Sequence, residues 1–146
     1  MTSADLGRIL ELEEQIFPDA WPETAFMEHL DHPSGGGVVA LNSYTIIGYA
    51  CFQGADEQMH LTNMAVDPAH RRKSVANELL GHILGLAREQ ECELIFLEVR
   101  ASNDVARRFY ESAGFRTIDT CDGYYENPVE DALVMLRWIE SDGDSR

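Results

Sequence analysis

The sequence predicts a mixed α/β (α+β) fold, with a mixed, mostly antiparallel central sheet and helices on both faces. Three runs of strand-forming residues precede Asp67, and Asn42-Ser43 is suited to join the first two as a hairpin. A long helical pattern, an apolar strand, a second helix and a last pair of strands follow. Hairpins combined with a strand–helix–strand unit are typical of such a layered domain.

Two helices and a turn are predicted before the first strand. Apolar residues recur at helical spacing through Met1–Ile16, with Ser3 or Asp5 as the N-cap. A second short helix is expected from Pro22 to about Leu30. The glycine run Ser34–Gly37 is predicted to be a flexible turn and not a phosphate loop, because no helix begins after it.

The remaining elements follow from alternation and helical spacing. The strands are expected at Val38–Leu41, Thr45–Phe52, Glu57–Val66, Leu94–Val99, Phe115–Tyr125 and Asp131–Ile139. One helix is expected from Ser74 to about Gln90, and another from the cap Asn103 to Ser112, with Gly114 ending it. The inner side of this last helix is predicted to carry Val105, Ala106, Phe109 and Tyr110.

Length and charge limit the possible functions. The 146 residues are predicted to form one domain, residues 1–140, followed by a disordered tail at 141–146. A formal net charge of −15 argues against direct nucleic-acid binding, because a phosphate backbone requires a basic face. An acidic surface suits a cationic substrate such as an amine or a basic peptide, although solubility alone also explains it.

Cysteine usage and hydropathy predict a cytoplasmic protein. The three cysteines lack paired spacing, which favours reduced thiols over a disulfide framework. The sequence contains no signal peptide pattern and no apolar run of about 18 residues, so neither export nor membrane association is expected.

The stretch Leu61–Leu80 carries the clearest functional pattern. A strand ends at Val66, Asp67-Pro68 turns the chain, and Arg71-Arg72-Lys73 precede the long helix. The start of a helix has unpaired N–H groups and partial positive charge, so three cations there favour a phosphate site over a solvated basic turn. Asp67–Lys73 contains no glycine, which excludes a nucleotide P-loop, and the dinucleotide pattern G-x-G-x-x-G is also missing.

Glu98 lies between Leu97 and Val99 in an otherwise apolar strand. A carboxylate in such a position usually belongs either to an ion pair or to a functional site. Arg100 shares its face of the strand and can supply the ion pair, so both interpretations stay open. Tyr110 is likewise either a core tyrosine or a member of the same site.

The sequence indicates neither a metal site nor a nucleophilic triad. The five histidines lack ligand spacing, and Pro33 argues against His29 and His32 sharing one helix face. No Ser-His-Asp or Cys-His arrangement is recognisable, and the three cysteines are interpreted as small hydrophobic residues.

Four segments carry a family resemblance when they are taken together: FPDAWPETAF, HLTNMAVDPAHRR, LEVRASNDVARRFYESAGF and GYYENPVEDALVM. From about Phe17 to Leu136 the chain resembles the GNAT acetyltransferases, and within them the ribosomal-protein-alanine N-acetyltransferases of the RimI type. The last two segments are the most specific. In them Glu98, Asn103, Tyr110 and the YY…EDA pattern occur in the family's order and spacing.

The resemblance implies transfer of an acetyl group from acetyl-CoA to an amine, most directly the N-terminal α-amine of a ribosomal protein or peptide. It implies that Glu98 is the general base and Tyr110 the general acid. The implied acetyl-CoA-binding residues are Met64, Ala65, Val66, Arg71, Arg72, Lys73, Ser74, Val75, Ala76, Asn77 and Asn103. The implied peptide-binding residues are Trp21, Tyr124, Tyr125 and Glu130, and no metal takes part.

Two positions depart from the family pattern. Ser74 stands where the family's Q/R-x-x-G-x-G/A loop has glycine, which predicts either a looser hold on the pyrophosphate or backbone strain. The chain also begins where the family's first strand ends, so either that strand is absent or Met1 is not the natural start.

Two other functions stay open. Acetylation of a small amine, such as a polyamine or an aminoglycoside, fits the acidic charge equally well, and only the tyrosine pair favours a peptide. A non-catalytic module that binds acyl-CoA or a partner is compatible with Ser74 in the loop.

Overall fold

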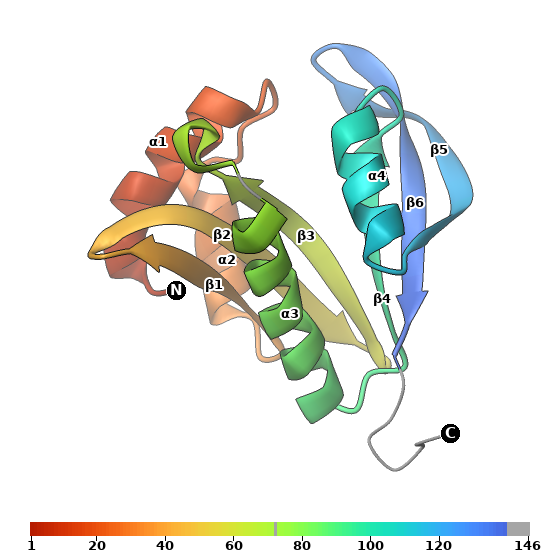
Figure 1. Cartoon of the computed structure of the whole chain (residues 1–146), viewed down its shortest axis with the longest axis horizontal. Coiled ribbons are helices and arrows are strands. Elements are labelled where there is room, and N and C mark those ends of the chain that lie inside the picture. Colours follow the sequence, from red (N-terminus) through yellow and green to blue (C-terminus); the bar gives the residue numbers. More distant parts are fainter. Residues whose placement is uncertain (72, 140–146) are drawn as a thin grey trace.

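One mixed sheet organises the protein (Figure 1). The computed structural model of the chain describes residues 1–71 and 73–139, with the backbone alone of Lys73. Over these ranges six strands pair in the order β1-β2-β3-β4-β6-β5, and all pairs except β3–β4 are antiparallel. The helical elements are η1 (Ser3–Asp5), α1 (Leu6–Ile16), α2 (Glu23–Asp31), η2 (Pro68–His70), α3 (Lys73–Glu89) and α4 (Asp104–Ser112). The strands are β1 (Gly35–Asn42), β2 (Thr45–Ala55), β3 (Gln58–Val66), β4 (Leu94–Arg100), β5 (Arg116–Glu126) and β6 (Val129–Trp138).

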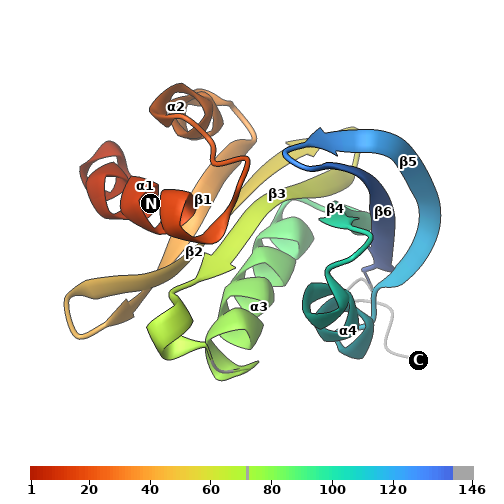
Figure 2. The same ribbon diagram turned by 90° about the horizontal axis from the view of Figure 1, so that it is seen from above.

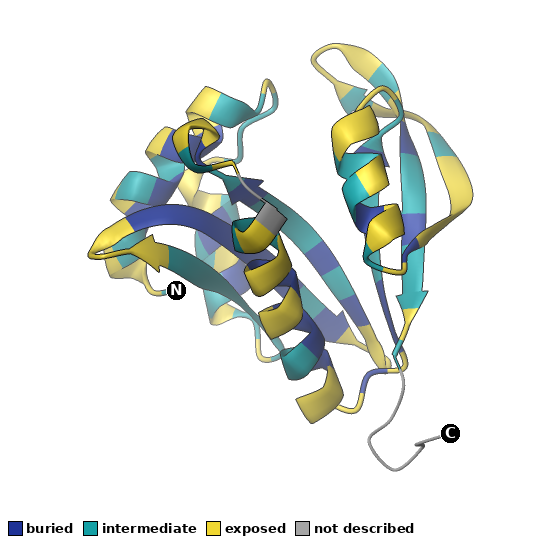
Figure 3. Cartoon of the chain, in the orientation of Figure 1, coloured by how far each residue is buried: buried dark blue, intermediate teal, exposed yellow. Residues whose placement is uncertain are grey.

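Helices cover both faces of the sheet, as predicted. α1 and α2 lie on one face, and α3 and α4 lie on the other (Figure 2). Each face has its own buried apolar cluster. Leu12 and Phe26 belong to the cluster under α1 and α2, whereas Ile83, Leu97 and Tyr110 belong to the cluster under α3 and α4. Burial follows the strands and the inner sides of the helices (Figure 3), because these surfaces are removed from water.

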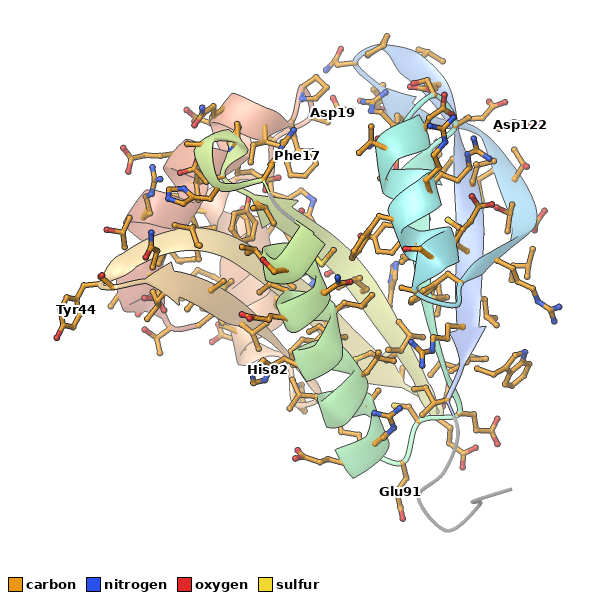
Figure 4. The ribbon with its side chains drawn as sticks, viewed as in Figure 1. Phe17, Asp19, Tyr44, His82, Glu91 and Asp122 are labelled. Carbon is orange, nitrogen blue, oxygen red and sulfur yellow. The ribbon has the colours of Figure 1, made fainter. Side chains whose placement is uncertain are left out.

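Most element boundaries agree with the sequence patterns. Asn103 caps α4, since its Oδ1 accepts the N–H of Ala106 at 3.1 Å, and Gly114 ends the helix with a φ of +91°. The β1–β2 hairpin turns at Ser43-Tyr44, one residue later than expected, and Tyr44 projects from its tip (Figure 4). No strand precedes η1 in residues 1–71, and the predicted tail at 141–146 lies outside the described residues.

The glycine run was predicted wrongly as a flexible turn. Gly35–Gly37 form the start of β1 and pair with Gln53–Cys51 of β2. A Cβ at Gly35 would lie 2.9 Å from the Cβ of His32, and a Cβ at Gly37 would lie 2.8 Å from the sulfur of Met1. Because the Cβ of His32 is fixed by the backbone, glycine is required at position 35 for close packing against the strand and not for a turn.

Val105 was also placed wrongly, on the inner side of α4. Its side chain is 82% exposed, whereas Tyr110 is only 9% exposed. Five residues of an α-helix advance the chain by about 1.4 turns, so Val105 lies well away from the face that carries Tyr110.

β3 and β4 are neighbours that separate along their length. They pair only over Gln58–His60 and Leu94–Phe96, at their first residues. The β2–β3 register skips Thr62, which forms a bulge, and a bulge bends a strand and increases its twist. The strands then diverge toward Val66 and Val99, which are not paired with each other although their strands are adjacent (Figure 1).

None of the helices in the described ranges is both long enough and apolar enough to cross a membrane.

Candidate active site

Glu98 lies on β4 where this strand leaves β3. Leu97 and Val99 point into the cluster under α3 and α4, so the alternation of a strand turns Glu98 toward the opposite face. Its Oε1 is 2.7 Å from Nε2 of His60 on β3, and its side chain is 16% exposed. The ion pair with Arg100 that the sequence allowed is not formed: Glu98 bonds to His60, and Arg100 pairs with Asp19 and Glu130.

The sequence interpretation missed His60. Its ring stacks on Phe96 with the centroids 4.3 Å apart and the planes tilted by only 12°. Stacking and the bond to Glu98 together restrict the rotation of the imidazole. The available signal was that His60 opens the HLTNMAV segment, but its proximity to Glu98 depends on the pairing of β3 with β4, which residue patterns do not give.

Two tyrosines of β5 lie near Glu98. Burial raises the pKa of Tyr124, and the charge of Glu98 raises it further. Burial likewise raises the pKa of Tyr125, with further increases from Tyr124 and Glu98. The guanidinium carbon of Arg100 lies 4.3 Å from the centroid of the Tyr125 ring. The structure thus brings the predicted tyrosine pair to the predicted base.

Trp21 is held on the α1–α2 face of the sheet. Its backbone N–H donates to Oε2 of the buried Glu13 at 3.0 Å, and its ring lies 5.1 Å from Phe26 and 4.8 Å from His29, centroid to centroid. The Nε2 of His29 is in turn 2.8 Å from Oγ1 of Thr62, the bulged residue of β3. These contacts tie Trp21 to the strand that carries His60.

Glu130 contacts the end of β4 from β6. Its Oε2 accepts the N–H of Ser102 at 2.6 Å, and its Oε1 accepts from Arg100 at 3.2 Å. The Ser102 hydrogen bond and the Arg100 charge lower the pKa of Glu130, which keeps the carboxylate ionised.

Tyr110 approaches from the other face. It belongs to the buried cluster that contains Leu97 and Val99, and it packs edge-on against Phe109 and Phe115. Burial raises its pKa well above the ordinary tyrosine value, with a smaller contribution from Tyr125, so the hydroxyl keeps its proton at physiological pH. Glu98 and Tyr110 therefore lie on the two faces of β4.

The predicted acetyl-CoA-binding backbone lies on β3 beyond its last pair with β4. Met64, Ala65 and Val66 pair with β2 on one side, and β4 does not pair with them on the other. An edge of this kind can accept an extended chain as an added strand. The backbone therefore fits an extended acyl carrier.

The loop from β3 to α3 is held by Asp67. Its carboxylate accepts the N–H of Ala69 at 3.0 Å and pairs with Arg8 at 3.0 Å. Arg71 is exposed and donates from Nε to the Val66 carbonyl at 3.3 Å. Because α3 begins at Lys73, its first N–H groups have no intrahelical acceptor and fit an anion.

Other predicted cofactor residues occupy the starts of helices. Ser74, Val75, Ala76 and Asn77 lie in the first turns of α3, and Asn103 is the exposed cap of α4. The predicted roles of Arg72 and of the Lys73 side chain lie outside the described residues. Across residues 1–71 and 73–139, no group of three or more His, Cys, Asp or Glu side chains is arranged to hold a metal ion.

Comparison with known proteins identifies the family. Residues 6–115 match the family model described as the acetyltransferase (GNAT) family. The chain belongs to the GNAT acetyltransferases. The N-alpha-acetyltransferase RimI of Mycobacterium tuberculosis is 34% identical over 143 residues, which cover 94% of this chain and 89% of that protein.

Solved structures agree with this assignment. The ribosomal-protein-S18-alanine N-acetyltransferase of Escherichia coli matches 100% of this chain and 95% of its own, with a TM-score of 0.88 and 26% identity. Arabidopsis thaliana Naa50, solved with the bisubstrate analogue CoA-Ac-MVNAL, shares the fold with a TM-score of 0.83 at 22% identity, and the match covers 94% of this chain and 96% of Naa50. The predicted GNAT fold, the RimI-type resemblance and the N-acetyltransferase class are confirmed.

Proposed function

We propose that this GNAT enzyme transfers the acetyl group of acetyl-CoA to the N-terminal α-amine of a protein, with a ribosomal protein as the acceptor. The observation that carries the proposal is the carboxylate of Glu98, held by His60 where β3 and β4 separate. The names of the M. tuberculosis and E. coli relatives support an N-terminal amine as the acceptor. We assign the activity to one domain, residues 1–140, and to the cytoplasm, where the free thiols of Cys51, Cys92 and Cys121 would stay reduced.

Acetyl-CoA is the acetyl donor in this proposal, as it is for GNAT enzymes. The unpaired edge of Met64, Ala65 and Val66 would bind its extended arm, and Asn103 would contact the same arm from α4. The N–H groups of Ser74–Asn77 would bind its pyrophosphate, together with Arg71, Arg72 and Lys73. No metal is part of the proposal.

Glu98 would act as the general base. A peptide α-amine has a pKa of about 8 and is mostly protonated at neutral pH, so it must lose a proton before it can attack. Glu98 would accept this proton directly or through a water molecule. The amine nitrogen then forms a bond to the acetyl carbon, and a backbone N–H near Met64 or Ala65 stabilises the oxyanion.

Tyr110 would assist the leaving group. As the carbon–sulfur bond breaks, the thiolate of CoA takes its proton from the Tyr110 hydroxyl, and the second proton of the amine, released as the amide forms, returns through solvent to the Tyr110 oxygen. The raised pKa of Tyr110 keeps this hydroxyl protonated, which suits a donor. Because a free thiol has the lower pKa, of about 8.5, the transfer is uphill, and the donated hydrogen bond provides much of the stabilisation.

Trp21, Tyr124, Tyr125 and Glu130 would border the peptide. They come from the α1–α2 loop and from the β5–β6 hairpin. The charge of Glu98 contributes to the raised pKa of both tyrosines. Two aromatic walls offer apolar surface, which suits the side chains of a peptide better than the charged chain of a polyamine.

A panel of acceptors tests the proposal. Purified protein is incubated with acetyl-CoA and either a peptide with N-terminal alanine, the same peptide with a blocked N-terminus, spermidine or an aminoglycoside. We expect release of CoA and an acetylated N-terminus by mass spectrometry with the free peptide, no reaction with the blocked peptide, and only a slow residual rate with spermidine or the aminoglycoside. Faster turnover of a small amine would transfer the assignment to the small-amine alternative. Calorimetric binding of acetyl-CoA without any turnover would favour the non-catalytic module.

A further inference from the structure

We propose that Arg100 is a positioning residue that joins the two sides of the peptide site and thereby sets the preference for a peptide over a small amine. The inference rests on the proposed function of the same site.

The guanidinium of Arg100 bonds to two separate segments. Its Nη2 donates to Oδ2 of Asp19 at 2.8 Å, on the loop between α1 and α2. Its Nη1 donates to Oε1 of Glu130 at 3.2 Å. The turn of the β5–β6 hairpin supplies two more acceptors, the carbonyls of Asn127 at 3.1 Å from Nη2 and of Pro128 at 3.0 Å from Nη1.

The segments that Arg100 joins carry the proposed peptide-binding residues. Asp19 precedes Trp21 by two positions, and Figure 4 shows it on the loop that faces the hairpin. The hairpin carries Tyr125, whose ring lies under the guanidinium. Oδ2 of Asp19 also accepts the backbone N–H of Asn127 at 3.3 Å, across 108 positions of sequence. Arg100 therefore lies at the centre of a contact between the two walls.

The network is shielded enough to hold its geometry. The side chain of Arg100 is 17% exposed, that of Glu130 18% and that of Asp19 32%. Ion pairs that are partly buried and share a planar guanidinium are less screened than exposed pairs and lose less side-chain entropy. Without Arg100, two carboxylates and two carbonyls would lose their common donor.

Lysine cannot reproduce this arrangement. An ammonium is a point charge without a flat face, whereas Arg100 uses both terminal nitrogens and one face at once. The conservative change is therefore expected to behave like the loss of the side chain.

The position of Arg100 explains why its effect should depend on the acceptor. It lies two residues from Glu98 on the same strand face, but both of its terminal nitrogens donate to protein acceptors, so it acts through the walls and not on the reacting atoms. An extended peptide must contact both walls, so its binding requires the two walls to be held in a fixed position relative to each other. A small amine reaches Glu98 without spanning them.

Steady-state kinetics of Arg100→Gln and Arg100→Lys test the inference, with Arg108→Gln on the exposed side of α4 as the matched control. The substrates are the alanine peptide and spermidine, and acetyl-CoA binding is measured by calorimetry. We expect KM for the peptide to rise at least tenfold in both Arg100 variants, with kcat within about threefold and acetyl-CoA affinity unchanged. The residual rate with spermidine should not change, so the peptide-to-amine ratio should fall at least tenfold. The control should match the wild type.

Asp19→Asn provides a second variant that keeps Arg100 and detaches one wall, so the test survives if an Arg100 variant fails to fold. It should show a smaller rise in peptide KM, and hydrogen exchange should increase in the α1–α2 loop of each variant. A peptide KM that stays at the wild-type value in Arg100→Gln overturns the inference, and so does an equal loss for peptide and spermidine. If the wild type acetylates no peptide, the proposed function fails instead.

Discussion

Oε1 of Glu98 and Nε2 of His60 lie 2.7 Å apart, across the point where β3 and β4 stop pairing. The two residues are 38 positions apart in the sequence, and the stacking of His60 on Phe96 fixes the ring that reaches Glu98. This contact gives the proposed base one defined orientation. We expect the second carboxylate oxygen to meet the substrate amine.

Glu98→Gln keeps the size of the side chain and removes its ability to accept a proton. We expect kcat to fall by a factor of 10² to 10⁴, the usual contribution of a general base, with little change in acetyl-CoA affinity. Stopped-flow or coupled assays measure the rate, and calorimetry measures the affinity. If affinity and rate fell together, Glu98 would have a structural role.

His60→Asn should lower kcat roughly tenfold, because the shorter asparagine neither reaches Glu98 as Nε2 of His60 does nor stacks on Phe96 in the same way. The exposed His82 on α3 (Figure 4) offers a matched control, and His82→Asn should leave the rate unchanged. Peptide turnover at saturating acetyl-CoA is the measurement. Equal rates for both variants would show that the His60 contact is dispensable.

Tyr110→Phe removes one hydroxyl from a buried ring and keeps its packing against Phe109 and Phe115. We expect kcat to fall at least tenfold, because the leaving thiolate loses its donor, while thermal stability changes by less than about 1 kcal/mol. The two readouts are peptide turnover and the unfolding midpoint. A wild-type rate in a stable variant would exclude Tyr110 as the donor.

Glu13→Ala is predicted to destabilise the fold. The buried carboxylate accepts from the Tyr49 hydroxyl at 2.6 Å, from the Asn63 amide at 2.9 Å and from the Trp21 N–H. Leaving these donors unpaired should cost about 3 kcal/mol, or roughly 10 °C in Tm. The exposed neighbour provides the control, since Glu14→Ala should stay within about 0.5 kcal/mol of the wild type. A small effect at both positions would contradict this assignment.

Asp67 should make the free energy of unfolding depend on pH in the acid range. The N–H of Ala69 lowers its pKa most, and the charges of Arg8 and His70 lower it further. A lowered pKa in the folded state means that the contribution is complete above the unfolded value of about 3.9 and is lost as the pH falls below it. Asp67→Asn should therefore be less stable than the wild type at pH 7, and this gap, the difference in the free energy of unfolding between the two proteins, should narrow below about pH 4. Urea midpoints across this range measure it, with Asp31→Asn as the exposed control. A gap independent of pH would contradict the assignment.

The order of elements was predictable because helical spacing and strand alternation are local. Glu98 was visible because a carboxylate among apolar strand residues is anomalous, and Asn103 because caps have a preferred chemistry. The glycine run was misread because its reason lies in contacts with Met1 and His32, which no local pattern contains.

The contacts that complete the site were not predictable from single positions. His60 meets Glu98 only because β3 and β4 are parallel neighbours, and Arg100 meets Asp19 across 81 positions of sequence. Patterning allowed Arg100 as an ion-pair partner of Glu98, since both share a strand face, and left a functional site as the other interpretation. The fold instead brings the carboxylates of Asp19 and Glu130 to Arg100, and these two carboxylates form the ion pairs.

The bulge at Thr62 has a consequence for the evolution of the enzyme. Deleting this one residue would make the pairs Leu61–Phe52 and Asn63–Cys51 consecutive, which would restore an unbroken ladder with β2 while the later side chains of β3 kept their faces. A straighter β3 could pair with β4 over more of its length and would gain backbone hydrogen bonds. If the edge of Met64, Ala65 and Val66 binds acetyl-CoA as proposed, selection for stability alone would close this edge and remove the site, so the bulge would persist only under selection for activity.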